Sequence, residues 1–108
     1  MSIIKKFVPQ KGICSVAFRL PESIADHPKS VAIVGDFNMW QPGKNMMHKN
    51  NKDIFTAKID LPIGKVYEFR YLIDKYIWEN EWEADGLVKT PYEEVYNSVI
   101  NCKEDKVD

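Results

Sequence analysis

Cysteine and histidine are scarce in this sequence of 108 residues: the only examples are Cys14, Cys102, His27 and His48. These residues stand singly along the chain, without the close ligand spacing of a zinc site, so we expect neither a metal nor a cofactor. The segment Met1–Lys6 has positive charge but is not followed by the apolar stretch of a signal peptide. We therefore expect a cytoplasmic protein with two reduced thiols, and a disulfide between them is the alternative.

Long apolar runs and an excess of one charge are also missing. No run approaches the roughly 18 apolar residues of a membrane-spanning helix. The 15 basic and 16 acidic residues give a net charge of −1 and are well mixed along the chain. A nucleic-acid-binding protein would need a strongly positive surface, and a membrane-surface protein a basic amphipathic helix. We therefore expect neither a nucleic acid nor a membrane as partner, but an uncharged molecule or another protein.

The 3.6-residue apolar spacing of an amphipathic helix is absent too, whereas apolar and polar residues alternate repeatedly, as in strands. The stretches that predict strands are residues 14–20, 30–34, 54–61, 65–73, 76–82 and 97–102. Turn residues separate short strands about every 8–12 residues, which is typical of an antiparallel sandwich. The pattern predicts a single all-β domain, an antiparallel β-sandwich. The polar ends, residues 1–11 and 103–108, are expected to be loosely held.

Candidate catalytic groups are few. Glu79, Glu81, Glu83 and Asp85 form an acidic cluster that suggests the paired carboxylates of a glycosidase. Alternation places the three glutamates on one face of a strand, where solvation accounts for them without catalysis. No serine lies in a nucleophile elbow, and no glycine-rich loop could hold a phosphate. We therefore expect no enzyme activity, and a small hydrolase that depends on Glu79 or Asp85 is the alternative.

The tryptophans Trp40, Trp78 and Trp82 require either burial or a ligand. Trp40 follows Gly35 in a turn that ends with Gln41-Pro42-Gly43. Trp78 and Trp82 are four residues apart on a predicted strand, which puts both on one face about 13 Å apart. An indole combines an apolar plane with a polar edge, and a sugar ring has apolar faces and a hydroxyl rim. The residues alone leave both a core role and a sugar platform open.

Several segments carry a resemblance to a known family: VGDFNMW at Val34–Trp40, IDLPIG at Ile59–Gly64, YEFRYLID at Tyr67–Asp74 and NSVI at Asn97–Ile100. In this order they resemble the G-x-F-N-x-W turn, the strand ending in D-L-P-x-G, the Y-x-Y/F-K/R-F/Y-x-V/I-D strand and the closing N-N/S-V/I-I strand of the family 48 carbohydrate-binding modules. That family includes the glycogen-binding domain of the AMP-activated protein kinase β-subunit. It also includes the early-set domains that precede the catalytic barrels of isoamylases and branching enzymes.

The resemblance implies an immunoglobulin-like β-sandwich of the early-set type over residues 13–102, between tails at residues 1–12 and 103–108. It also implies a non-catalytic module that binds an α-glucan polysaccharide or oligosaccharide, such as glycogen, starch or maltodextrin. A glycan-metabolising enzyme in trans is a further implied partner. The alternative is a protein-interaction or regulatory sandwich with a vestigial sugar site, which docks onto such an enzyme.

The resemblance also implies roles for single residues. Trp40 corresponds to the first stacking platform, Arg70 to the basic residue that contacts sugar hydroxyls, and Asn97 to the asparagine that contacts the edge of the sugar. The chain departs from the glycogen-binding domains just before the closing asparagine, where Glu93 and Val95 replace leucine and threonine. A carboxylate at this place changes the surface offered to a helical glucan.

Two residues compete for the role of the second stacking tryptophan. Trp78 lies nearest to the turn at Asp74, as the family pattern requires. Trp82 keeps the family's W-x-x-D spacing through Asp85, which would make Lys75–Trp78 part of a longer hairpin. We favour Trp82 slightly and keep both residues as candidates.

Overall fold

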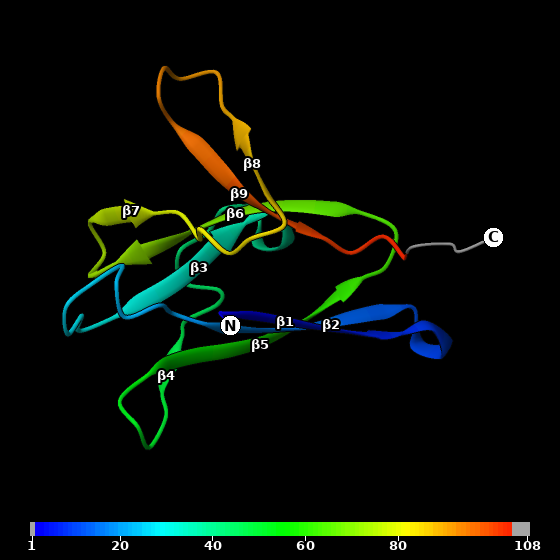
Figure 1. Cartoon of the computed structure of the whole chain (residues 1–108), viewed down its shortest axis with the longest axis horizontal. Coiled ribbons are helices and arrows are strands. Elements are labelled where there is room, and N and C mark those ends of the chain that lie inside the picture. The colour runs from blue at the N-terminus through cyan, green and yellow to red at the C-terminus, as the bar shows by residue number, and fades with distance from the viewer. Residues whose placement is uncertain (1, 105–108) are drawn as a thin grey trace.

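The computed structural model describes residues 2–104, which form two antiparallel sheets packed as a sandwich (Figure 1). The first sheet has the order β1-β2-β5-β4, with β1 at Ile3–Val8, β2 at Ile13–Arg19, β4 at His48–Lys49 and β5 at Phe55–Pro62. The second has the order β3-β6-β9-β8, with β7 also paired to β6: β3 at Val31–Gly35, β6 at Val66–Ile73, β7 at Ile77–Glu79, β8 at Gly86–Lys89 and β9 at Tyr96–Asn101. The described residues contain two 3₁₀ turns, η1 at Pro9–Lys11 and η2 at Asp36–Asn38, and no helix suited to crossing a membrane. The predicted all-β sandwich of the immunoglobulin-like early-set type is confirmed.

Alternation along the strands separates the core from the surface, as the sequence predicts. In β6, Tyr67, Phe69 and Tyr71 are buried between the sheets, while Glu68 and Arg70 lie on the outer face. In β2, every second residue is likewise buried. The strand β3 is buried at all five positions because its inner face meets the core and its outer face is covered by a side chain of the following turn. One strand can therefore build the core and expose a polar row at the same time.

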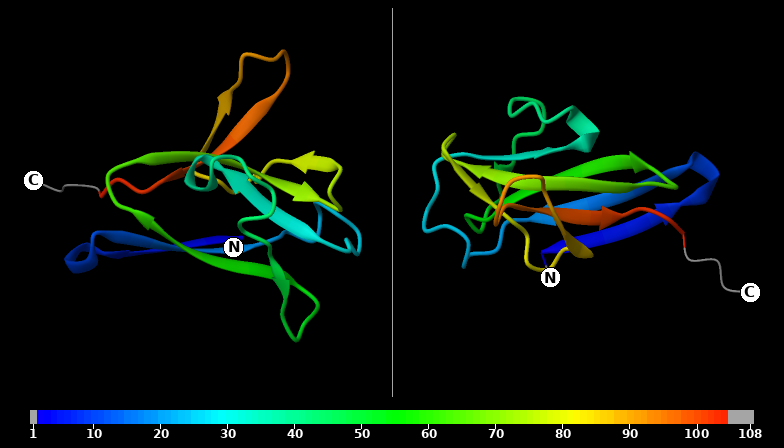
Figure 2. Two further views of the ribbon diagram at one scale, coloured as in Figure 1. Left: turned by 180° about the vertical axis from the view of Figure 1, so that it is seen from behind. Right: turned by 90° about the horizontal axis from the view of Figure 1, so that it is seen from above.

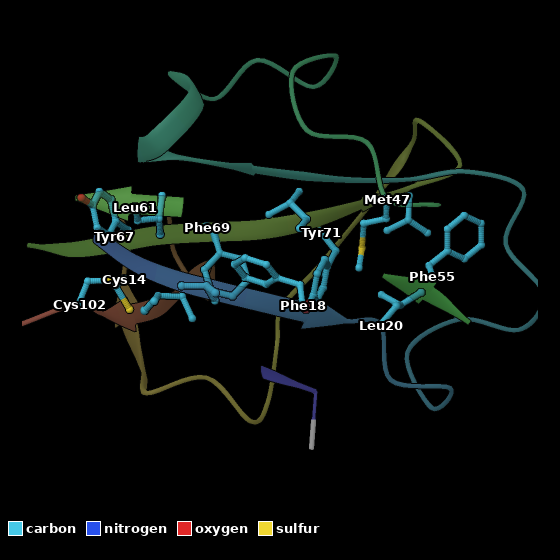
Figure 3. Packing of buried hydrophobic residues seen from close by; sticks show 14 of the residues in the cluster. Cys14, Phe18, Leu20, Met47, Phe55, Leu61, Tyr67, Phe69, Tyr71 and Cys102 are labelled. Carbon is cyan, nitrogen blue, oxygen red and sulfur yellow. The ribbon is translucent and has the colours of Figure 1, made fainter. Parts of the chain in front are cut away.

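Aromatic side chains form the centre of the core between the sheets (Figure 3). The ring centroids of Phe18 and Phe69 are 5.4 Å apart, and those of Phe69 and Tyr71 are 5.8 Å apart, both edge to face. This geometry suits the quadrupoles of the rings and adds to the free energy gained by burying their area. At one end of the sandwich the core is closed by Leu20, Met47 and Phe55, and at the other end by Cys14, Leu61, Tyr67 and Cys102 (Figure 3).

The N-terminal segment differs from the expectation of a loosely held end. Residues 3–8 form β1, which pairs with β2 along its whole length, from Ile3 opposite Phe18 to Val8 opposite Ile13. Lys5 reaches across the open side of the sandwich, where its Nζ lies 2.8 Å from Asp85 Oδ2 and 3.0 Å from the Asn101 carbonyl oxygen. The sequence of β1, IIKKFV, does not alternate between apolar and polar residues, so periodicity gives no signal for this edge strand. Residues 105–108 of the predicted C-terminal tail lie outside the described residues.

The region after β6 also differs from the prediction. The expected strand over residues 76–82 is shorter, since β7 ends at Glu79, and β8 lies within the expected loop over residues 83–96. The hairpin of β8 and β9 projects from the body of the sandwich (Figures 1 and 2). All four residues of β8 are exposed. No burial pattern marks β8 in the sequence because half-buried alternation requires a sheet face packed on a core.

Glu81 is fully buried, so the prediction that it belongs to a solvated acidic edge is wrong. Its carboxylate accepts hydrogen bonds from the Tyr71 hydroxyl at 2.8 Å and from the Glu83 backbone N–H at 3.0 Å. The Glu81 N–H in turn donates to Ser98 Oγ at 2.8 Å. Burial and the neighbouring carboxylate raise the pKa of Tyr71, which keeps its hydroxyl available as a donor. The alternation fails here because the chain turns inward once β7 has ended.

Cys14 and Cys102 are both free and fully buried. Burial raises the pKa of Cys102, and the neighbouring Cys14 thiol raises it further. The neutral thiol is the form that an apolar environment favours. Both side chains therefore act as small apolar groups of the core.

We expect both thiols to react slowly with a disulfide reagent in the folded protein and rapidly in urea. The reacting species is the thiolate, which burial disfavours. Because burial raises the pKa of Cys102, the unfolded chain loses this thiol proton first, so the free energy of unfolding should decrease as the pH rises above 9.0, the ordinary pKa of the thiol. Thiol titration with and without urea measures the first effect, and urea unfolding at increasing pH the second. Equal reaction rates in both states would contradict the burial of the pair.

Candidate functional site

The turn after β3 depends on a close approach of two strands. A Cβ atom at Gly35 would lie 2.4 Å from the Glu68 carbonyl oxygen and 2.7 Å from Phe69 Cβ, so only glycine fits. Asn38 then fixes the turn: its Nδ2 donates to the Ile33 carbonyl at 2.9 Å, and its Oδ1 accepts from the Gly35 N–H at 3.0 Å. The G-x-F-N part of the sequence motif is thus a folding requirement of this turn.

Trp40 follows in a conformation that the turn imposes. Met39 and Trp40 both have left-handed backbones, with φ of 56° and 58°. Trp40 Nε1 donates to Asp36 Oδ1 at 3.0 Å, and Asp36 Oδ2 accepts from the Glu68 N–H at 2.8 Å. The indole packs against the apolar residues on the outer face of the second sheet, Ala32, Val34 and Leu72. Since its polar edge is already bonded and one side lies on the sheet, the position of the ring is set before any ligand binds.

Arg70 links Trp40 to a second tryptophan. The guanidinium carbon of Arg70 lies 5.6 Å from the ring centroid of Trp40 and 4.8 Å from that of Trp78, both within cation–π range. Pairing explains the arrangement: Arg70 is opposite Val34 on β3, and Leu72 is opposite Trp78 on β7. The two rings therefore come from opposite sides of β6. We call Trp40, Arg70 and Trp78 the aromatic ledge.

Asn97 and Glu68 lie beside the aromatic ledge. Asn97 is nine-tenths buried, and its Nδ2 donates to Glu68 Oε1 at 3.0 Å. Phe69 is opposite Ser98, so continuing the register by one residue brings Asn97 opposite Arg70. Glu68 is absent from the residues predicted from the sequence. Its only signal there is alternation, which places it two residues before Arg70 on the same face of β6.

Comparison with known families agrees with this geometry. Residues 22–92 match carbohydrate-binding module 48, the isoamylase N-terminal domain. The chain belongs to this family. The matched residues include η2, β6 and β7, which carry the aromatic ledge, and the predicted family is confirmed. No curated protein matches the chain.

The module does not bring all the predicted site residues together. Trp40, Arg70 and Trp78 are in mutual contact through the guanidinium, with Asn97 beside them, whereas Trp82 lies in the loop after β7 with 72% of its side chain exposed. The expectation that Trp78 and Trp82 share one strand face is wrong, because β7 ends at Glu79. Periodicity could not reveal this, since it assumes that the strand continues.

Two departures from the family pattern lie in the turn between β8 and β9. Glu93 is exposed, and the N–H of the half-buried Val95 donates to the Tyr92 carbonyl at 3.2 Å. The hydroxyl of Thr90 donates to the Val95 carbonyl at 2.8 Å, which closes the turn. The carboxylate of Glu93 therefore points toward solvent from a turn that is held by its own hydrogen bonds.

Two members of the acidic cluster, Glu81 and Asp85, have structural partners. Asp85 Oδ2 accepts from Lys5 Nζ and from the Asn101 N–H, each at 2.8 Å, and Glu81 is sealed in the core. Within residues 2–104, no three His, Cys, Asp or Glu side chains are grouped to hold a metal ion. His27 Nδ1 lies 2.6 Å from Asp26 Oδ1, and both side chains are almost fully exposed. No nucleophile accompanies this pair in the described hydrogen bonds.

We expect Gly35→Ala to lower the free energy of unfolding by about 1–3 kcal/mol, because the added methyl group would overlap the backbone of β6. Gly43→Ala is the matched control, since a Cβ atom there meets nothing within 4 Å. The control should change stability by less than about 0.5 kcal/mol. Urea unfolding of the three proteins provides the comparison, and equal midpoints would refute the steric role of Gly35.

Proposed function

We propose that this module binds α-glucans such as glycogen, starch or maltodextrin on the aromatic ledge, without catalysing a reaction. The observation that carries the proposal is the position of Arg70 against the rings of both Trp40 and Trp78 on an outer sheet face. Indole planes suit the C–H faces of glucose units. The guanidinium offers several N–H donors in a fixed plane for the hydroxyl rim. Burial lowers the pKa of Arg70, yet a guanidinium remains charged at neutral pH.

The open shape of the ledge suits a polymer. A cavity of about 500 Å³ lies at an end of the sandwich between Leu20, Lys49 and Phe55, and no ledge residue lines it. A shallow surface contacts each sugar unit on one side only, so a chain can pass across it. Binding of this kind gives modest affinity per unit because little surface is removed from water.

We expect Trp40→Ala to weaken the binding of maltoheptaose about tenfold or more, because the ligand loses one stacking plane. Titration of the wild-type protein and of the variant, followed by isothermal calorimetry, measures the difference. Far-ultraviolet circular dichroism should be the same for both proteins, since Trp40 lies outside the core cluster between the sheets. Equal affinities would exclude Trp40 from the site.

Trp78→Ala and Trp82→Ala identify the second platform. Because Trp78 contacts Arg70, Trp78→Ala should weaken maltoheptaose binding about tenfold, as Trp40→Ala does. Trp82→Ala serves as the matched control and should bind as the wild type does. The opposite result, with loss only in Trp82→Ala, would assign the second platform to Trp82.

A protein-interaction module is the second candidate. It is favoured by exposed apolar side chains outside the ledge, on β7, the loop after it and the β8–β9 hairpin: Ile77, Trp82, Leu87, Val88, Tyr92 and Tyr96. Docking onto a glycan-metabolising enzyme in trans would cover them. This candidate would be favoured if the immobilised protein binds no sugar but retains such an enzyme, and if added maltoheptaose does not change the amount retained. The cytoplasm is the compartment we propose for either function, supported by the two neighbouring free thiols.

A further inference from the structure

Glu68 places a carboxylate at the aromatic ledge, next to groups proposed to hold a neutral sugar. We propose that Glu68 is a further ligand-contacting residue, whose Oε2 accepts a hydrogen bond from a glucan hydroxyl. A second part of the proposal is that this charge makes the site select neutral glucans over phosphorylated ones. The inference rests on the proposed function, because it concerns the same surface.

The spacing along β6 supports a contact with the same sugar chain. Glu68 and Arg70 are two residues apart on one strand and face the same side, about 7 Å from each other. Arg70 is a donor without acceptor capacity, whereas a carboxylate only accepts. Sugar hydroxyls both donate and accept, so neighbouring hydroxyls of one chain can meet both residues.

The carboxylate of Glu68 is already oriented. Its Oε1 accepts from Asn97 Nδ2 at 3.0 Å. Because a carboxylate cannot donate, the amide of Asn97 must turn its NH₂ group toward Glu68. Among the hydrogen bonds of residues 2–104, none engages Glu68 Oε2, and the side chain is only half-buried. One oxygen is therefore fixed by the protein and the other is free to accept, so the side chain is partly ordered before a ligand binds, which lowers the entropy cost of binding.

The local charge provides the selectivity. Asp36 bonds the Trp40 indole and the Glu68 N–H, so its carboxylate lies at the same surface as that of Glu68. Arg70 is the cation in contact with both rings. Two carboxylates beside one guanidinium leave no excess positive charge for a phosphate ester. The negative carboxylates repel a phosphorylated glucan, whereas they have little effect on a neutral one.

Glu68→Gln tests the proposal with little change of shape. With the Asn97 NH₂ group kept toward residue 68, the single amide oxygen of glutamine accepts from it, and the glutamine NH₂ group replaces Oε2 as the outward group. The variant thus exchanges an outward acceptor for a donor and keeps the bond to Asn97. We expect it to bind maltoheptaose about 3- to 10-fold more weakly than the wild type. The preference for maltoheptaose over a phosphorylated maltoheptaose should also decrease.

Asp60→Asn on β5, in the other sheet, is the control for a lost surface charge and should change neither property. Glu68→Ala is a second variant, which should lose the preference for the neutral ligand as Glu68→Gln does. Thermal unfolding and circular dichroism show whether each variant is folded. If Glu68→Gln binds maltoheptaose within twofold of the wild-type affinity and has the same ligand preference, the role of Glu68 is overturned, while the proposed function is not. A wild-type protein that does not bind maltoheptaose would overturn the proposed function as well.

Discussion

The close contact between the end of β3 and the backbone of β6 determines where the surface tryptophan can lie. Because no side chain fits at Gly35, the chain comes near enough for Asp36 to bond the Glu68 N–H while it also bonds the indole of Trp40. The left-handed backbone at Met39 and Trp40 follows from the need to return the ring to the sheet. The close approach at Gly35 thus fixes where the indole ring of Trp40 lies on the sheet.

The strand β6 serves the core and the surface together. Its inward side chains Phe69 and Tyr71 belong to the aromatic centre of the core, and its outward side chains Glu68 and Arg70 belong to the candidate site. A strand held by packing on one face gives the polar groups of its other face little freedom to move. Rigid placement matters here because a shallow surface has few contacts to compensate for the ordering of loose side chains.

Features that depend on neighbouring residues in the sequence were predictable, and features that depend on contacts between distant segments were not. Local alternation predicted the strands around Phe18 and Phe69, and the residues around Trp40 predicted that it lies in a turn after a strand, where the structure has it half-buried. Pairing between distant segments was not predictable: β1 is identified by its ladder with β2, and β8 by its ladder with β9. The ambiguity between Trp78 and Trp82 had the same origin, since the end of β7 depends on hydrogen bonds to β9 rather than on nearby residues.

The segment WENEW shows how those distant bonds shape the ledge. Trp78 points outward, and after Glu79 the chain turns so that Asn80 donates to the Tyr96 carbonyl at 2.9 Å. Glu81 then enters the core, where a carboxylate without a bonded partner would be costly. The Tyr71 hydroxyl and the Glu83 backbone N–H satisfy the carboxylate, and the Glu81 N–H donates to Ser98 on β9, so Glu81 holds the end of β7 against β6 and β9. Two glutamates therefore have opposite roles beside β6: the buried Glu81 anchors the strand that carries Trp78, while one carboxylate oxygen of the outward Glu68 has no hydrogen-bond partner among residues 2–104.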